Sequence, residues 1–227
     1  MSLFLDFDGT LVPLADTPDG IKVPETLGER LVALAGRQDG RLALVTGRYL
    51  DDITGHLSTD GIAMSGSHGA EFHNLPGVEA APVDPGRSDA ALRAVERFAQ
   101  ECEGLLIERK AHGFGLHYRA NPDARHRVEA LADELAALHD LRIKRGKMVI
   151  ELTHSTADKG AAVRAIMDAK PFSDGMPVFV GDDVGDEDGF RAAGDLGGFG
   201  VLVGEPRETA ARYRFDDVSE VHAWLGL

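Results

Sequence analysis

The residues best suited to chemistry form two acidic clusters, each placed directly after an apolar run. The first is Asp6-Phe7-Asp8-Gly9-Thr10, and the second has five acids in residues 182–188. Like charges held close together need a cation between them, and carboxylate oxygens suit Mg²⁺, which can also bind a phosphate oxygen. Either cluster alone is also typical of an Asp-rich turn or a solvated loop, so the interpretation depends on what surrounds it.

We predict that the two clusters share one metal ion. Asp6 and Asp8 would point the same way if the first strand continued through both. Asp182 leaves its apolar run first and is predicted to be a direct ligand. Asp183 or Asp186 would bind the metal directly or through water.

Two further motifs supply groups that can hold a phosphate. Thr46-Gly47-Arg48 ends another apolar run, where a hydroxyl and the following amides can donate hydrogen bonds. Lys159 opens a predicted helix, so its ammonium can lie beside a helix N-terminus. Gly9 allows the chain to bend, and its amide is expected to face the anion.

The elements around these motifs alternate between strand and helix. The hydrophobic patterns predict strands at residues 3–7, 41–46, 61–65, 177–180 and 199–203, and helices at 24–35, 49–57, 159–168 and 218–225. This alternation indicates an α/β fold with a Rossmann-like parallel sheet. Because such sheets bind ligands beyond the carboxyl ends of their strands, the motifs above should meet at one edge.

An insert interrupts this pattern after a Pro/Gly-rich stretch at residues 82–86. Residues 86–151 read as two amphipathic helices and two strand pairs in the order αββαββ, which predicts an α+β domain. The catalytic core is therefore expected to comprise residues 1–85 and 152–227.

Composition limits the range of partners. The formal net charge of -14 repels phosphate backbones, so we expect neither a nucleic-acid nor a membrane partner. The insert holds 12 Lys and Arg against 11 Asp and Glu, so the acidity belongs to the core. Cys102 is the only cysteine and the N-terminus lacks a signal-peptide pattern, so we expect a cytoplasmic protein. The sequence leaves the oligomeric state open, and a monomer is favoured.

As a set, these motifs resemble the haloacid dehalogenase superfamily of phosphatases, through Asp-x-Asp-Gly-Thr, Thr-Gly-Arg, a Lys that opens a helix, and Gly-Asp-Asp-x-x-Asp-Glu. Within this superfamily the sequence is most similar to the trehalose-6-phosphate phosphatase family. That similarity is carried by Gly-x-His-Gly-Ala-Glu (66–71), Ile-Glu-Arg-Lys (107–110), Leu-His-Tyr-Arg (116–119) and Lys-Met-Val-Ile-Glu (147–151).

The resemblance implies Mg²⁺-dependent hydrolysis of trehalose 6-phosphate in two steps. Asp6 would attack phosphorus to form an aspartyl-phosphate, and Asp8 would protonate the leaving sugar oxygen and then activate water. Thr46 and Lys159 would stabilise the phosphoryl oxygens. The backbone carbonyl of Asp8 would join Asp6 and Asp182 around the metal, and the insert would be a cap that closes over the sugar.

The insert also carries the residues expected to recognise the sugar. A disaccharide offers many hydroxyls, which charged side chains can bind through directional hydrogen bonds. The candidates are Glu108, Lys110, His117, Arg119, Lys147 and Glu151, and the resemblance favours Glu108, Lys110, Lys147 and Glu151. Such residues are equally typical of the solvated face of a sheet. His68 is expected beside the core cleft, with a capped turn histidine as its alternative.

Two positions depart from the family pattern. Thr153 and the preceding leucine stand where the family usually has a proline after a basic residue, and Gly185 stands where it commonly has threonine. The nearest alternative function is a phosphatase for another sugar phosphate, of the sucrose or mannosylglycerate type, and a phosphomutase is a further enzyme alternative. A signalling receiver or an inactive sugar-phosphate binding protein is a different class, disfavoured by Asp8, the full acidic set and the cap.

Overall fold

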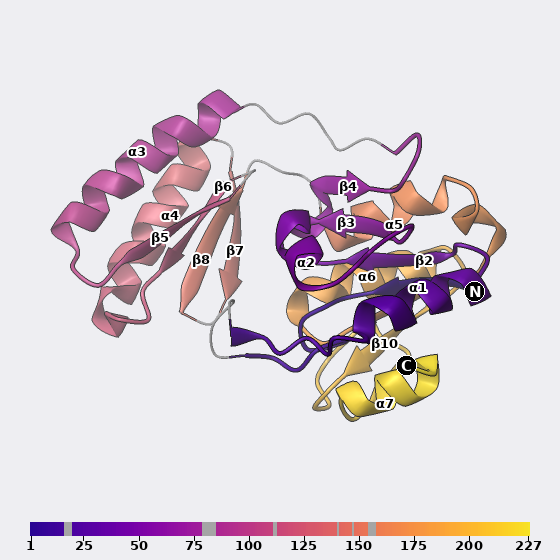
Figure 1. Cartoon of the computed structure of the whole chain (residues 1–227). Coiled ribbons are helices and arrows are strands. Elements are labelled where there is room, and N and C mark those ends of the chain that lie inside the picture. Colours follow the sequence, from indigo (N-terminus) through magenta and orange to yellow (C-terminus); the bar gives the residue numbers. More distant parts are fainter. Residues whose placement is uncertain (16–19, 79–84, 111–112, 140, 147, 154–157) are drawn as a thin grey trace. The chain divides into compact units, whose positions relative to one another are not determined.

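The computed structural model describes residues 1–15, 20–78, 85–110, 113–139, 141–146, 148–153 and 158–227, with only the backbone for 85–89 and 110. The chain divides into two compact units, Met1–Ala80 with Ala157–Leu227, and Ala81–Thr156 (Figure 1). No helix of the described ranges is long and apolar enough to cross a membrane.

The first unit is built on a seven-stranded sheet whose strand order is β11-β10-β9-β1-β2-β3-β4. Its strands are β1 (Ser2–Leu5), β2 (Leu42–Val45), β3 (Ala63–Gly66), β4 (Glu71–His73), β9 (Pro177–Gly181), β10 (Phe199–Val203) and β11 (Tyr213–Phe215). All neighbours pair in parallel except β3 and β4. The predicted α/β class with a parallel sheet is confirmed.

Helices cover both faces of this sheet, because the strand residues that point to each face are apolar. On one face Leu3 and Leu5 pack in a core with α1 (Leu27–Arg37), α2 (Leu50–His56) and α7 (Val218–Leu225). On the other, Phe4 packs with α5 (Lys159–Met167) and α6 (Glu187–Asp195). Strands buried on both sides are typical of parallel sheets and explain the continuous apolar runs.

The sheet order creates a switch point at β1. The chain runs from β1 outward through β2 and β3, and later returns to β9 on the opposite side of β1. Diverging connections of this kind leave a crevice beyond the carboxyl ends of the central strands, where ligands bind. Asp6, Thr46 and Asp182 each directly follow one of these strands.

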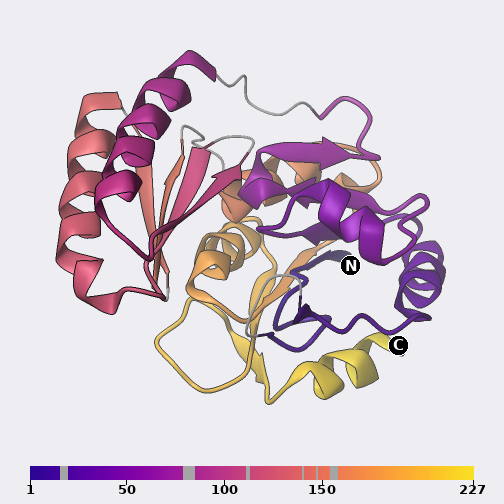
Figure 2. The ribbon, with the colours of Figure 1, turned by 60° about the vertical axis from the view of Figure 1, so that its left-hand side comes forward.

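The second unit is a four-stranded antiparallel sheet with two helices against one face (Figure 2). The strands are β5 (Leu106–Lys110), β6 (Gly113–His117), β7 (Arg142–Gly146) and β8 (Val149–Thr153), in the order β5-β6-β8-β7. The helices are α3 (Pro85–Glu101) and α4 (Arg125–His139). Phe114, Leu116 and Ile150 pack beneath them in a separate hydrophobic core.

Three elements of the first unit were not predicted, namely β4, β11 and α6. Short 3-10 turns, also not predicted, include Ser67–Gly69, Phe172–Asp174 and Val184–Asp186, whereas the 3-10 turn Pro122–Ala124 lies at the start of the second helix predicted in the insert. The first strand is also shorter than predicted, because β1 ends at Leu5 and Asp6 already lies beyond it.

Candidate active site

Asp6 is held in the interior at the end of β1. Its amide donates to the carbonyl of Val180 on β9 across 2.9 Å, which fixes the backbone between two strands. The residue is only 4% exposed. Since the strand stops before Asp6, the alternation that would have aligned Asp6 with Asp8 does not apply, and the two carboxylates have different partners.

The partner of Asp6 is Lys159, the first residue of α5. Asp158 caps this helix by accepting the Ala161 amide at 2.7 Å. Lys159 is 2% exposed, and its ammonium lies 2.8 Å from Asp6 Oδ1 and 2.5 Å from Asp186 Oδ1. Burial alone would lower the pKa of this ammonium, but Asp186 and Asp6 outweigh burial and raise it, so Lys159 stays charged.

Asp186 is the buried centre of the second acidic cluster. Its Oδ2 accepts the amides of Asp182 at 2.9 Å and Asp183 at 3.0 Å, while its Oδ1 faces Lys159. Gly181 is required beneath it, because a Cβ there would overlap the Asp186 carboxylate. Asp183 is exposed, and its side chain caps the 3-10 turn Val184–Asp186. Asp183 and Asp186 were the two candidates for a further metal ligand, and of these Asp186 lies inside the site whereas Asp183 does not.

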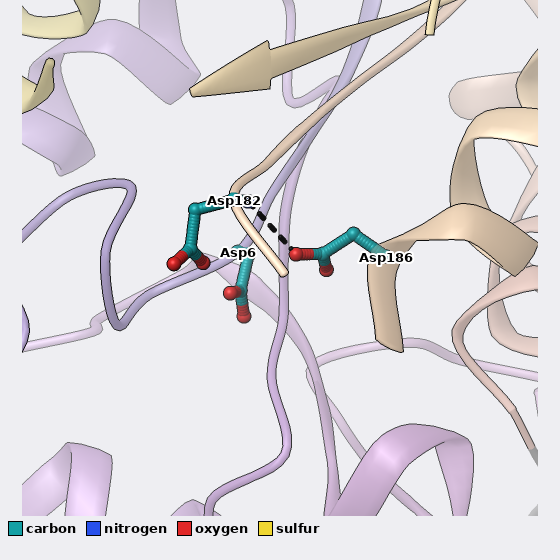
Figure 3. Close-up of side chains that lie close together, drawn as sticks. All are labelled: Asp6, Asp182 and Asp186. Atoms are coloured by element: carbon teal, nitrogen blue, oxygen red, sulfur yellow. Dashed lines mark hydrogen bonds between the residues drawn. The ribbon is translucent and has the colours of Figure 1, made fainter. Parts of the chain in front are cut away.

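Asp6, Asp182 and Asp186 converge (Figure 3). One carboxylate oxygen from each residue lies within 4.8 Å of the others. Burial and then the Asp186 charge raise the pKa of Asp6 well above its usual range, against the influence of Lys159. Burial, Asp186 and Asp183 raise the pKa of Asp182 to about 7, and burial also raises that of Asp186. The three carboxylates, two of which contact the Lys159 ammonium, form an all-oxygen donor set that fits a hard divalent cation such as Mg²⁺.

Gly9 is needed where the loop after β1 passes the acidic cluster. Its φ of 72° is in the left-handed region, and a Cβ at this position would overlap the Asp182 carboxylate. The expectation that its amide faces an anion differs from the structure, because that amide donates to the Val12 carbonyl at 2.8 Å. Gly9 therefore gives the loop its shape and makes room for Asp182.

Arg48 has a partner that the sequence did not predict. Its guanidinium binds Asp8 in a bidentate pair, with Nε 2.6 Å from Oδ2 and Nη2 2.8 Å from Oδ1. Its amide donates to Thr46 Oγ1 at 3.1 Å, inside the turn that follows β2. In the structure the Arg48 side chain binds Asp8, and its contact with phosphate stays a prediction. Thr46 is 1% exposed.

His68 lies against the same turn. Its amide donates to the Thr46 carbonyl at 3.0 Å, and its ring fills the space where a Cβ on Gly47 would stand. Its φ of 59° is in the left-handed region, a strained conformation that often marks functional segments. Glu71, to which we assigned no role, accepts the Ser67 hydroxyl and the amide of residue 50, so it ties together the turns after β2 and β3.

The second unit gathers several predicted residues on one face of its sheet. The register aligns Glu108, Gly115, Glu151 and Lys144 across the four strands. They lie on the face opposite the core residues Phe114 and Leu116. Lys144 was not predicted, although its place opposite Glu151 follows from strand alternation.

The other predicted residues of this unit lie outside that row of aligned residues. His117 Nε2 lies 2.8 Å from Glu108 Oε2, so the two side chains form a pair. Lys110 ends β5 two residues after Glu108, so strand alternation assigns the two positions to the same face of the sheet. Arg119 is exposed in the turn after β6, and Lys147 lies outside the described residues.

Solved structures with the same fold place this architecture in a known class. A trehalose-6-phosphate phosphatase related protein matches with a TM-score of 0.76 and 27% identity, covering 99% of this chain and 95% of that one. The C-terminal domain of the C. albicans trehalose-6-phosphate phosphatase matches in fold, with a TM-score of 0.80, 21% identity, and 99% and 90% coverage. A subclass IIB sugar phosphatase of the haloacid dehalogenase superfamily matches with a TM-score of 0.60, 17% identity, and 99% and 98% coverage. The chain therefore shares the fold of these phosphatases.

Sequence comparison narrows this class. The trehalose-phosphatase family profile matches residues 4–219, and the chain therefore belongs to this family of phosphoric monoester hydrolases. It is 39% identical over 210 residues to a probable trehalose-phosphate phosphatase of Sinorhizobium fredii, covering 90% of this chain and 78% of that protein. It is 33% identical over 229 residues to the trehalose-6-phosphate phosphatase of Escherichia coli K12, covering 99% and 85%.

Proposed function

We propose that this protein hydrolyses trehalose 6-phosphate to trehalose and phosphate, with Mg²⁺ as cofactor. The observation that carries the proposal is the cluster of buried Asp6, Lys159 and Asp186 with half-buried Asp182 at the switch point of the sheet, in a chain of the trehalose-phosphatase family. A buried carboxylate touching a charged lysine is suited to be a nucleophile toward a phosphorus atom.

In the proposed mechanism Asp6 and Asp8 divide the chemistry. An Asp6 carboxylate oxygen forms a bond to phosphorus as the bond from phosphorus to the sugar oxygen breaks, and Asp8 gives its proton to that oxygen. Asp8 then takes a proton from water, whose oxygen attacks phosphorus and releases Asp6. Arg48 orients Asp8 for both transfers. Lys159, Thr46 and the turn at Gly47 hold the phosphoryl oxygens.

We propose that Asp6, Asp182 and Asp186 hold the Mg²⁺, together with the backbone carbonyl of Asp8. Each carboxylate keeps an unused lone pair beside its present hydrogen bonds. When bound, Mg²⁺ neutralises the clustered negative charge and polarises the phosphoryl oxygens. Asp183 stays outside this set, because its side chain caps the following turn.

We propose that the second unit is a cap domain that recognises the sugar through its polar sheet face. Glu108, His117, Lys144 and Glu151 present both signs of charge from four adjacent strands. A neutral disaccharide is bound by directional hydrogen bonds, and charged groups make the stronger ones. Lys110, Arg119 and Lys147 are proposed to extend the same surface.

A substrate panel tests the proposed function. With Mg²⁺, we expect faster phosphate release from trehalose 6-phosphate than from glucose 6-phosphate, sucrose 6-phosphate or mannosyl phosphoglycerate. Chelation of Mg²⁺ by EDTA should stop release, and added Mg²⁺ should restore it. Preference for another sugar would refute the substrate and leave the mechanism standing. Phosphorylation of the protein without turnover would instead indicate a signalling function.

Replacement of Glu151 by Ala tests the role of the polar face. Loss of one charged hydrogen-bonding group should raise KM for trehalose 6-phosphate about 10-fold to 100-fold, since such bonds contribute about 1.5–3 kcal/mol. Hydrolysis of p-nitrophenyl phosphate, which has no sugar, should keep its KM. Glu129→Ala is the matched control, because Glu129 pairs with Arg125 on α4. Equal loss with both substrates would show that Glu151 does not read the sugar.

A further inference from the structure

The acidic loop that carries Asp182 and Asp186 is bound from outside by a segment about twenty residues later in the chain. Arg207, between β10 and β11, donates from Nη2 to the carbonyl of Asp183 at 2.7 Å and from Nη1 to the carboxylate of Glu187. One guanidinium therefore bridges residues on either side of Val184–Asp186, the single 3-10 turn of the loop.

Glu187 is itself firmly held. Its Oε2 accepts the Ala210 amide at 2.8 Å, and the Thr209 side chain donates to the same carboxylate. Burial would raise the pKa of Glu187, but the bonds from Ala210, Thr209 and Arg207 outweigh burial and lower it. Glu187 is therefore a buried carboxylate that is bound by residues 207–210, and it begins α6 directly after Asp186.

The turn is restrained on its inner side by the Asp186 carboxylate, which accepts the amides of Asp182 and Asp183 and contacts Lys159. Arg207 adds a restraint on the outer side. A single 3-10 turn has weak hydrogen-bond geometry and low intrinsic stability. Gly185, at its middle, adds backbone freedom and no side-chain contact. Three carboxylates that repel one another lie on its inner side. Without the outer contact, the positions of Asp182 and Asp186 would depend on the inner hydrogen bonds alone, and the repulsion between the carboxylates opposes those bonds.

We propose that Arg207 and Glu187 form a clamp that positions Asp182 and Asp186 for divalent-cation binding. This inference rests on the metal site of the proposed function. Neither Arg207 nor Glu187 belongs to the proposed ligand set of Asp6, Asp182 and Asp186, so the clamp acts through the geometry of the ligands. Groups that orient metal ligands in this way typically change metal affinity by about 10-fold to 100-fold when they are removed.

Direct metal titration tests the clamp. The variants are Arg207→Ala, Arg207→Lys and Glu187→Gln, and Mn²⁺ binding is measured by electron paramagnetic resonance beside the Mg²⁺ dependence of phosphate release. We expect Arg207→Ala to weaken Mn²⁺ binding about 10-fold to 100-fold, with kcat at saturating Mg²⁺ within about 3-fold of the wild type. Arg207→Lys should recover only part of the affinity, because one ammonium cannot reproduce the two-sided fork.

Arg191→Ala is the matched control. Arg191 lies on α6 and pairs with exposed Asp188, so its removal changes the local charge equally without touching the turn. Unchanged Mn²⁺ affinity in Arg207→Ala, or equal weakening in Arg191→Ala, would refute the clamp. Should Arg207→Ala fail to fold, Glu187→Gln and Arg207→Lys carry the same comparison. A wild-type protein that binds no Mn²⁺ or Mg²⁺ would refute the metal site itself, a result distinct from failure of the clamp alone.

Discussion

Asp6→Asn is expected to abolish phosphate release, by at least about 10⁴-fold, while the folded protein becomes more stable in the absence of metal. The amide keeps the size of the carboxylate but cannot attack phosphorus. The stability gain follows from the surroundings of Asp6, which is buried beside Asp182 and Asp186. Lys159 offsets only part of this repulsion, since the pKa of Asp6 remains raised.

The pH dependence of this stability gain has a defined sign. Because the pKa of Asp6 is raised in the folded state, the native protein holds a proton that the unfolded chain has released, and the wild type loses stability as pH rises above about 4. The advantage of Asp6→Asn should therefore be large near neutral pH and shrink as pH falls toward 4. Thermal unfolding with EDTA at several pH values measures it.

Asp195→Asn is the control for Asp6→Asn. This substitution makes the same chemical change on the surface of α6, where Asp195 pairs with Arg164. Activity and unfolding temperature should therefore stay near the wild-type values. Addition of Mg²⁺ should stabilise the wild type more than Asp6→Asn, because the variant lacks one negative ligand. Near-normal turnover in Asp6→Asn would show that another residue is the nucleophile.

The sequence predicted the strands that position the site more reliably than the edges of the sheet. β1, β2, β9 and β10 are buried on both faces and read as uninterrupted apolar runs. The edge strands β4 and β11 have only three residues each and are largely accessible, so they carry no such signal. Helix α6 was missed because its first turn belongs to the acidic run, which is also typical of a loop.

The same limit applies to the site. Asp6, Thr46 and Asp182 follow neighbouring parallel strands, so the sheet topology brings them to one edge. The hydrophobic pattern of the sequence alone predicts this placement. Which side chain binds which partner depends on local turns. The capping role of Asp183, the bidentate pair between Arg48 and Asp8, and the contact of Arg207 with the acidic loop all arise from backbone geometry that no spacing rule encodes.

Lys159→Met is expected to have the largest effect on stability. The ammonium touches both Asp6 and Asp186, and all three groups are buried. Removal of one partner from a buried ionic cluster typically destabilises a protein by about 3–5 kcal/mol, because the remaining charges lose their compensation. For a chain of this size, the unfolding temperature should fall by roughly 6–20 °C. Phosphate release should fall at least about 100-fold, because a donor to the phosphoryl oxygens is lost.

Lys170→Met separates this effect from the simple loss of a lysine. Lys170 is exposed and pairs with Asp174 on the surface, where ion pairs contribute little to stability. The unfolding temperature of Lys170→Met should therefore differ little from that of the wild type. An unfolding temperature of Lys159→Met equal to that of the wild type would refute the compensating role of the ammonium.

Mg²⁺ connects the stability of Lys159→Met to the proposed function. A cation bound by Asp6, Asp182 and Asp186 supplies the positive charge that this variant lacks. Mg²⁺ should therefore raise the unfolding temperature of Lys159→Met by more than it raises that of the wild type, while turnover stays low. Recovery of stability without recovery of activity would separate the two tasks of Lys159, since the cation can balance the carboxylates but cannot replace a hydrogen-bond donor to the phosphoryl group.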